Sequence, residues 1–374
     1  MKEALLDFLV ATVGNGMVKI IYGPYGAGIE TFLFSTLRSH LERECPQAKI
    51  IDTRGLSFDE IKRACLENES EDGRLFVLVK DLWNLANFDT IVSLCARRKN
   101  VDLFALARTA SPLRFPEKQT LVRGRLQTVH FPSTLYEDYL KEYPDSDVLD
   151  FLTCNDLDSD VVTKNLKVLN QLETTCLTAM IQPGGTPLTE RGLAKEISEK
   201  TKQRFSWYRS KAVVEKIEGL GICYFIDRWD IKQKKVISGK VVFPVDGRYY
   251  KIGSRGKKKT DLCMVSALIA KLLYDHWDVK KAIYESQRKK AYCRDTDAGF
   301  LVKKNGWSFL LFSGESLSDD LVEKARLAPS SLPKIIVSLD ALGGVRYGDD
   351  GLIYYSFETL LKEGLRIYGE RACL

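Results

Sequence analysis

The segment Val18–Thr31 constrains the fold of this chain more than any other stretch of the sequence. It reads V-K-I-I-Y-G-P-Y-G-A-G-I-E-T, and the residues that follow, Phe32–Leu37, are typical of a helix. A strand, a glycine-rich loop and the amino end of a helix form a cradle for phosphate, because backbone N–H groups and the helix dipole attract anions. The segment therefore predicts a P-loop.

The loop keeps the glycines of the pattern G-x-x-x-x-G-K-[ST] and loses its two reactive side chains. In that pattern the lysine contacts the β- and γ-phosphates and the hydroxyl binds magnesium. Ile29 stands at the lysine position and Glu30 at the hydroxyl position. The part of the predicted nucleotide site that lies in the loop is Gly23, Gly26, Gly28, Ile29, Glu30 and Thr31.

Strands and helices alternate through the first third of the chain. Further strands are predicted at 49–53, 74–79, 101–106 and 128–131. Ser57 followed by Glu60 fits a capping box at the start of the helix between the first two of these strands. The alternation predicts an α/β domain, with a parallel sheet and helices on both faces, that closes near residue 135.

Composition narrows the class of protein. With 374 residues and 45% apolar content, the chain is long enough for two or three domains. The nine cysteines contain no C-x-x-C pair and the three histidines have no ligand-spaced partner, which excludes an obvious zinc site and favours a reducing cytoplasm. No apolar run is long enough to cross a bilayer, so we expect no membrane partner.

The net charge of +6 is unevenly distributed. Residues 137–160 hold nine acidic side chains and one basic, whereas residues 228–259 hold eleven basic and two acidic. An acidic connection followed by a basic half suggests two units with different partners.

The region after the acidic connection has the element order of a winged helix, which is three helices and then a hairpin. The predicted helices and strands are 165–180, 187–194, 205–219, 221–229 and 235–243. The third helix would expose cations and aromatic rings, and a basic stretch follows the hairpin. The candidate nucleic-acid-binding residues are Arg204, Trp207, Arg209 and Lys211, with Tyr208 beside them, and Lys257, Lys258 and Lys259. Two other interpretations stay open: a merely solubilising cationic face, or a protein-binding surface.

A third unit begins near residue 248. An apolar helix is predicted at 261–273, followed by a hairpin of 300–304 and 308–312 around Asn305-Gly306 and a strand at 334–338. Asn-Gly between alternating apolar residues is a strong hairpin signal.

The order of these pieces resembles the archaeal and bacterial AAA-type ATPases that join a P-loop domain to a winged helix and a restriction-nuclease-like domain. The segments that carry the resemblance are Gly23–Gly28, Leu75–Leu82, Phe104–Ser111, Arg123–Arg125 and Val129–Tyr139. The resemblance implies a P-loop ATPase domain at 1–136, an acidic helical connection at 137–164, a winged helix at 165–247 and a nuclease-like α/β domain at 248–374.

Both sites that the resemblance implies have lost residues. The magnesium-binding aspartate of the second ATPase motif is replaced by Lys80, and Asp81 stands at the position of its glutamate. We therefore predict that Glu30 and Lys80 form an ion pair in the place of the metal, although Lys80 contacting a phosphate, or simple drift, would also account for the substitution. In the nuclease-like domain Asp297 could be a metal ligand, but the next strand offers no Glu or Lys. We interpret Asp297 as a solvated loop acid and expect no nuclease activity.

Two functional hypotheses follow. The first is a non-catalytic pseudo-ATPase that serves as a DNA-binding or protein-assembly scaffold, with no cofactor and with DNA, an active ATPase relative or a second copy of the chain as partner. The alternative is an ATP-binding switch or weak ATPase in which Lys80 replaces the missing lysine.

Overall fold

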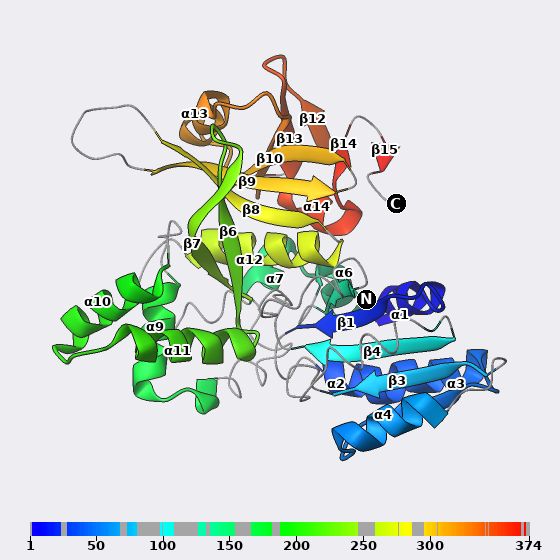
Figure 1. Ribbon diagram of the computed structural model, residues 1–374. Coiled ribbons are helices and arrows are strands. Elements are labelled where there is room, and N and C mark those ends of the chain that lie inside the picture. Colours follow the sequence, from blue (N-terminus) through cyan, green and yellow to red (C-terminus); the bar gives the residue numbers. More distant parts are fainter. Residues whose placement is uncertain are drawn as a thin grey trace. The chain divides into compact units, whose positions relative to one another are not determined.

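The computed structural model describes residues 2–23, 28–67, 73–80, 98, 100–107, 126–131, 135–153, 166–181, 188–245, 259–275, 277–285, 295–304, 306–340, 342, 344–367 and 370–371 (Figure 1). The chain divides into two compact units. The first contains Met1–Ser133 with Gly219–Gly221, and the second contains Thr134–Glu218 with Ile222–Leu374.

The first unit is built on a parallel sheet of five strands. The strands are β1 (Val18–Tyr22), β2 (Lys49–Asp52), β3 (Leu75–Val79), β4 (Val101–Ala107) and β5 (Leu126–His130), in the order β2-β3-β4-β1-β5. Every neighbouring pair is parallel, as the alternation of strands and helices predicts. The central strands are mostly apolar because both faces of a parallel sheet are covered, and Lys19 of β1 and Asp102 of β4 are the exceptions.

Helices cover both faces of this sheet. They are α1 (Lys2–Ala11), α2 (Ile29–Thr31), η1 (Phe32–Leu37), α3 (Arg38–Glu44) and α4 (Phe58–Glu67). Ile61 and Cys65 of α4 pack with one set of strand residues, while Leu9 of α1 and the side chains of η1 pack with the other. The run α2-η1-α3 follows the glycine-rich loop, and its middle, η1, is a π-helical segment that the sequence did not predict.

The second unit begins with helices. These are α6 (Tyr136–Glu142), α7 (Val148–Thr153), α9 (Gln171–Met180), α10 (Glu190–Thr201) and α11 (Trp207–Gly219). Thr189 caps α10, since its Oγ1 accepts a hydrogen bond from the Gly192 N–H at 3.0 Å. The ion pair between Lys216 Nζ and Glu173 Oε2, at 2.7 Å, links α11 to α9.

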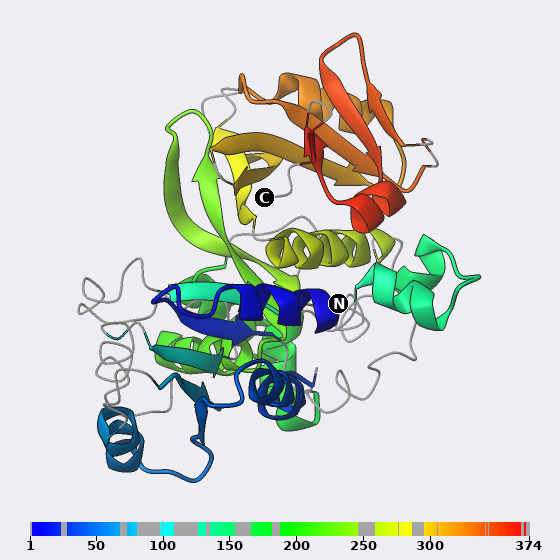
Figure 2. The same ribbon diagram turned by 90° about the vertical axis from the view of Figure 1, so that its right-hand side faces the viewer.

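An eight-stranded mixed sheet forms the rest of the second unit. Its order is β12-β13-β11-β10-β9-β8-β6-β7. The strands are β6 (Cys223–Asp230), β7 (Lys235–Pro244), β8 (Asp278–Glu285), β9 (Asp295–Lys304), β10 (Trp307–Gly314), β11 (Lys334–Ser338), β12 (Val345–Tyr347) and β13 (Leu352–Ser356), and a separate pair is β14 (Arg366–Ile367) with β15 (Glu370–Arg371). Three helices pack against the large sheet: α12 (Lys259–Tyr274), α13 (Asp319–Leu327) and α14 (Phe357–Glu363). Figures 1 and 2 show α12 and α13 on opposite faces of it.

Two hairpins in this sheet match the sequence predictions. The strands β9 and β10 pair in antiparallel fashion, with Trp307 opposite Lys304, and Gly306 takes the positive φ of 85° that the turn requires. The strands β6 and β7 also form a hairpin. However, β6 pairs in parallel with β8, so one sheet contains strands from both sides of residue 248. The domain bounds drawn from the sequence, the winged helix and the nuclease-like fold stay predictions.

Candidate functional site

The glycines at the two ends of the loop are required by the backbone. A Cβ at Gly23 would lie 2.2 Å from the carbonyl oxygen of Phe131, so the chain can pass there only without a side chain. Gly28 has a φ of 79°, which is the left-handed region that glycine adopts without strain. The carbonyl of Gly28 then accepts the N–H of Phe32 at 2.9 Å as the helix begins. These two glycines hold a turn between a strand and a helix.

The side chain at the lysine position belongs to the core. Ile29 is partly buried and packs against the cluster that includes Phe32 and Phe131. It offers no charge to a phosphate. Thr31, which follows Glu30, is exposed.

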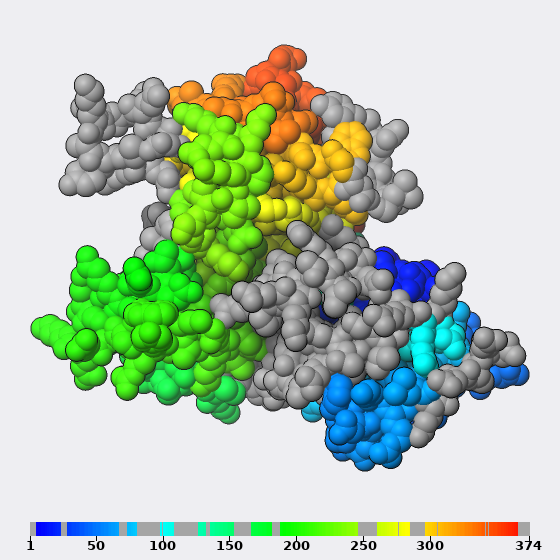
Figure 3. All heavy atoms as spheres, viewed as in Figure 1, coloured from blue at the N-terminus to red at the C-terminus, as the bar shows by residue number. Residues whose placement is uncertain are grey.

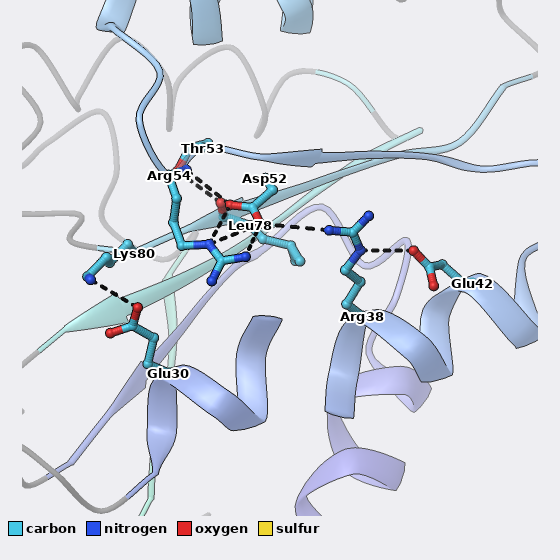
Figure 4. A network of polar contacts seen from close by, with 8 residues as sticks. All are labelled: Glu30, Arg38, Glu42, Asp52, Thr53, Arg54, Leu78 and Lys80. Carbon is cyan, nitrogen blue, oxygen red and sulfur yellow. Dashed lines mark hydrogen bonds and ion pairs between the residues drawn. The ribbon is translucent and has the colours of Figure 1, made fainter. Parts of the chain in front are cut away.

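Glu30 and Lys80 form the predicted ion pair. Lys80 directly follows β3, and its Nζ lies 2.9 Å from Oε1 of Glu30 on α2 (Figure 4). The two side chains are 48% and 46% exposed. Glu30 and Lys80 therefore satisfy one another's charge, although water reaches both.

A second set of charges lies beside this pair, and sequence reasoning missed it. Asp52, the last residue of β2, accepts hydrogen bonds from Arg54 Nε at 3.0 Å and from Arg54 Nη2 at 2.5 Å. Arg38 Nη1 lies 3.7 Å from Oδ2 of the same carboxylate, and Arg38 Nε donates to Glu42 at 2.9 Å (Figure 4). The available signal was that Asp52 and Lys80 end neighbouring parallel strands and must therefore lie at the same edge of the sheet.

These charges cancel. Three acids and three bases form the network, which is Glu30, Glu42, Asp52, Arg38, Arg54 and Lys80. The hydrogen bonds from Arg54 lower the pKa of Asp52, and the same carboxylate raises the pKa of Arg54. The guanidinium of Arg54 also lies over the ring of Phe34, 4.1 Å from its centroid.

The network fits poorly to magnesium nucleotide. Ile29 gives no cation, Glu30 would face the phosphates with negative charge, and the ammonium of Lys80 is paired with a carboxylate. Among the residues that the structure describes, no cluster of His, Cys, Asp and Glu has the form of a metal site. Gly26 and Asp81, which also belong to the predicted nucleotide site, lie outside the described residues.

The predicted nucleic-acid-binding residues of α11 and its approach are exposed. Arg204, Trp207, Tyr208, Arg209 and Lys211 all face solvent, while Val213 and Ile217 on the same helix are buried. Figure 3 displays α10 and α11, in green, as part of the surface that faces the viewer. Lys257 and Lys258 lie outside the described residues, and Lys259 is the first residue of α12.

The interpretation of Asp297 as a solvated loop acid is wrong. Asp297 lies in β9, where its carboxylate accepts Lys281 Nζ at 2.6 Å, Lys324 Nζ at 2.7 Å and the Gly299 N–H at 2.8 Å. Burial alone would raise the pKa of Asp297, but the charges and hydrogen bonds of the two lysines outweigh it and lower the pKa to about 2. Lys281 lies in β8 and Lys324 in α13, so no local sequence pattern predicts that they contact Asp297.

None of the described helices is long and apolar enough to cross a membrane. Neither a protein-family model nor a curated protein matches the sequence.

Several solved structures are similar to the chain. The structure of Cdc6p from Pyrobaculum aerophilum has 13% identity, with 71% of this chain and 94% of that chain covered and a TM-score of 0.28. A chain of Drosophila ORC bound to AT-rich DNA and Cdc6 has 13% identity, with 67% and 89% covered and a TM-score of 0.25. The replication initiator DnaA bound to AMPPCP and single-stranded DNA has 12% identity, with 57% and 86% covered and a TM-score of 0.29. Similarity of this degree carries no information on what this chain binds.

Proposed function

We propose that the protein is a non-catalytic, AAA-type P-loop protein that acts as a DNA-binding scaffold. The observation that carries the proposal is the ion pair between Glu30 and Lys80 at 2.9 Å, in the place where the motif would hold magnesium. Phosphoryl transfer needs cations and a metal to stabilise charge on the transferred phosphate. Here the charges of the network cancel without a metal or a nucleotide, and Ile29 stands at the position of the loop lysine.

The alternative is an ATP-binding switch in which Lys80 contacts the phosphate. It requires Lys80 to leave Glu30, and it leaves the Glu30 carboxylate beside a nucleotide that is itself negatively charged. Repulsion between these like charges opposes binding, so the geometry favours the scaffold.

Isothermal titration with ATP and magnesium separates the two hypotheses. We expect no heat of binding at millimolar nucleotide and no phosphate release from the wild-type protein.

The triple variant Ile29→Lys, Glu30→Thr, Lys80→Asp restores the motif, and we expect it to bind nucleotide under conditions in which the wild type does not. Lys62→Asp makes on α4 the charge change that Lys80→Asp makes beside the loop, and it is the control for that one substitution. Metal-dependent turnover in the wild type that disappears in Lys80→Ala and persists in Lys62→Ala would overturn the proposal.

The DNA-binding half of the proposal rests on the exposed cations of α11 and its approach. Arg204 and Arg209 make no ion pair with any residue that the structure describes, and Lys211 has only a long contact of 3.9 Å with Glu215. Exposed arginines without acidic partners are available to phosphates. We expect binding of DNA at low salt. A plot of log K against log salt concentration has a negative slope, and this slope should be shallower in Arg204→Ala/Arg209→Ala than in the wild type. The exposed Lys195 on α10, changed together with Lys62 to alanine, provides a control of equal charge.

A further inference from the structure

The amino end of α11 carries two exposed aromatic rings that stack on one another. The ring centroids of Trp207 and Tyr208 are 3.8 Å apart and the planes meet at 29°. Trp207 is 41% exposed and Tyr208 is 68% exposed. Large aromatic side chains are ordinarily buried at least in part, because each ring contributes substantial apolar area to a core. The two rings form an exposed, stacked pair, which we call the platform.

Exposed cations lie before and after the platform in the sequence. Arg204 precedes it and Arg209 and Lys211 follow it within the next turn of the helix, all of them exposed. The opposite side of α11 is fixed, since Val213, Val214 and Ile217 are buried and Lys216 is held by Glu173. The platform therefore stands on a helix that is anchored to α9, with its rings and charges directed away from the core.

The hairpin after α11 is fixed to the larger sheet at the start of its turn. In a winged helix that binds a duplex, one helix enters the major groove and the hairpin would give a second contact. Here β6 pairs with β8, and the N–H of Ile231 at the turn donates to the carbonyl of Ile283 at 3.0 Å. The side chain of Ile231 belongs to the cluster that includes Leu321 of α13. Ile231, at the start of the turn, is thus packed against the sheet, whereas residues 232–236 are exposed.

An exposed aromatic platform with flanking cations is the arrangement that binds single strands. Bases in a duplex are stacked on one another and offer only their edges, whereas unpaired bases offer their faces to aromatic side chains. Cations beside the rings contact the backbone phosphates of the same strand.

We propose that Trp207 and Tyr208 bind the bases of single-stranded nucleic acid by stacking, with Arg204, Arg209 and Lys211 on its phosphates. This inference rests on the proposed DNA-binding function and names its substrate class. The two rings account for the preference for single strands over duplex, and the three cations account for the salt dependence. Substitution of the rings or of the cations should therefore remove one property without the other.

Fluorescence anisotropy with the full chain tests the proposal, using a labelled 20-nucleotide oligo-dT, an oligo-U of the same length and a duplex of mixed sequence. We expect the single strands to bind more tightly than the duplex. In Trp207→Ala/Tyr208→Ala the affinity for oligo-dT should fall at least about fivefold, with the salt slope unchanged, because stacking is worth roughly 1–3 kcal/mol per base. In Arg204→Ala/Arg209→Ala the magnitude of the salt slope should decrease by about 1.4, because each phosphate contact on a single strand contributes roughly 0.7.

Trp307→Ala is the matched control, because Trp307 is 42% exposed but lies in β10. We expect it to bind oligo-dT as the wild type does. Tighter binding of the duplex, or an aromatic double variant that binds oligo-dT like the wild type, would overturn the stacking platform while leaving the DNA-binding scaffold in place. Absence of binding to all three probes at low salt would overturn both.

Discussion

Two lysine–carboxylate pairs lie at opposite ends of the parallel sheet in the first unit. At the amino ends of the strands, Lys19 of β1 is paired with Asp102 of β4, and both side chains are almost completely buried. The N–H of Gly14 donates to both oxygens of Asp102 at 3.0 Å. At the carboxyl ends of the strands, Glu30 and Lys80 form a pair of the same type that is about half exposed.

The two pairs differ in burial, and this difference indicates that the buried pair supports the fold whereas the exposed pair lies where a ligand would bind. Burial lowers the pKa of Lys19 although the carboxylate of Asp102 raises it, so the charge on Lys19 depends on Asp102. Removing one member of a buried pair leaves an uncompensated charge, whereas an exposed pair exchanges its partner for water. Ligands of parallel α/β sheets bind beyond the carboxyl ends of the strands. That end holds charges that can change at little cost to the fold.

The largest effect is expected from Asp102→Asn. Lys19 would then be buried without a counter-charge, so the free energy of unfolding should fall by about 3–5 kcal/mol. Urea denaturation measures it. Replacing both residues, in Lys19→Met/Asp102→Leu, should recover most of the loss, because the pair is then removed as a whole. A loss below about 1 kcal/mol in Asp102→Asn would contradict the role that we assign to burial.

A smaller effect is expected from Asp297→Asn in the second unit. Asp297 is 38% exposed while Lys281 is nearly buried, so the burial of this pair is intermediate. We expect a loss of about 2 kcal/mol in urea denaturation, since a buried lysine loses its charged acceptor. Asp278→Asn, on an exposed carboxylate of β8, is the matched control and should stay within about 0.5 kcal/mol of the wild type. Equal effects of the two changes would show that the lysines find water instead.

The pH dependence of stability offers a second measurement on Asp297. Its pKa in the folded protein is about 2, below the value of 3.8 for an unperturbed aspartate. A lowered pKa means that the stabilisation is fully present above pH 4 and is lost as the pH falls from about 4 towards 2. Because solvent screens a partly exposed group, we expect Asp297 to account for about 1 kcal/mol of that loss. Thermal unfolding between pH 5 and 2 should show a shallower decline in Asp297→Asn than in the wild type.

The smallest effect is expected at the loop. Lys80→Met and Glu30→Gln should each change the free energy of unfolding by less than about 1 kcal/mol, which is the usual range for exposed pairs. Addition of 0.5 M salt should reduce even that difference, because exposed charges are screened. A loss comparable to that of Asp102→Asn would mean that the Glu30–Lys80 pair supports the fold and not only the loop.

Local patterns predicted several parts of the molecule correctly. The parallel sheet follows from the alternation of apolar runs with helices, and the turn at Gly306 follows from Asn-Gly. The capping box is present, with the Ser57 N–H donating to Glu60 at 2.6 Å and the Glu60 N–H donating to Ser57 Oγ at 3.4 Å. The Glu30–Lys80 pair was predictable because the resemblance implies that the P-loop and the strand before Lys80 place these two residues at one site.

Other parts could not be read from the sequence because they join distant segments. Lys281 and Lys324 meet Asp297 from a neighbouring strand and from a helix, and nothing at any of the three positions marks the others. Arg54 depends on a turn that brings its side chain back over Asp52. The pairing of β6 with β8 spans an intervening helix, and it places a hairpin that resembles an independent wing inside a larger sheet.

The position of β6 between β7 and β8 has a consequence for local unfolding of the second unit. Residues 220–222 alone separate α11 from β6, and β6 is hydrogen-bonded to both β7 and β8. A ligand that binds the folded form of α11 makes every opening that disrupts α11 less frequent. If α11 and β6 open together, oligo-dT bound at Trp207 should slow amide hydrogen exchange in β6 and β8, in strands that the ligand does not touch.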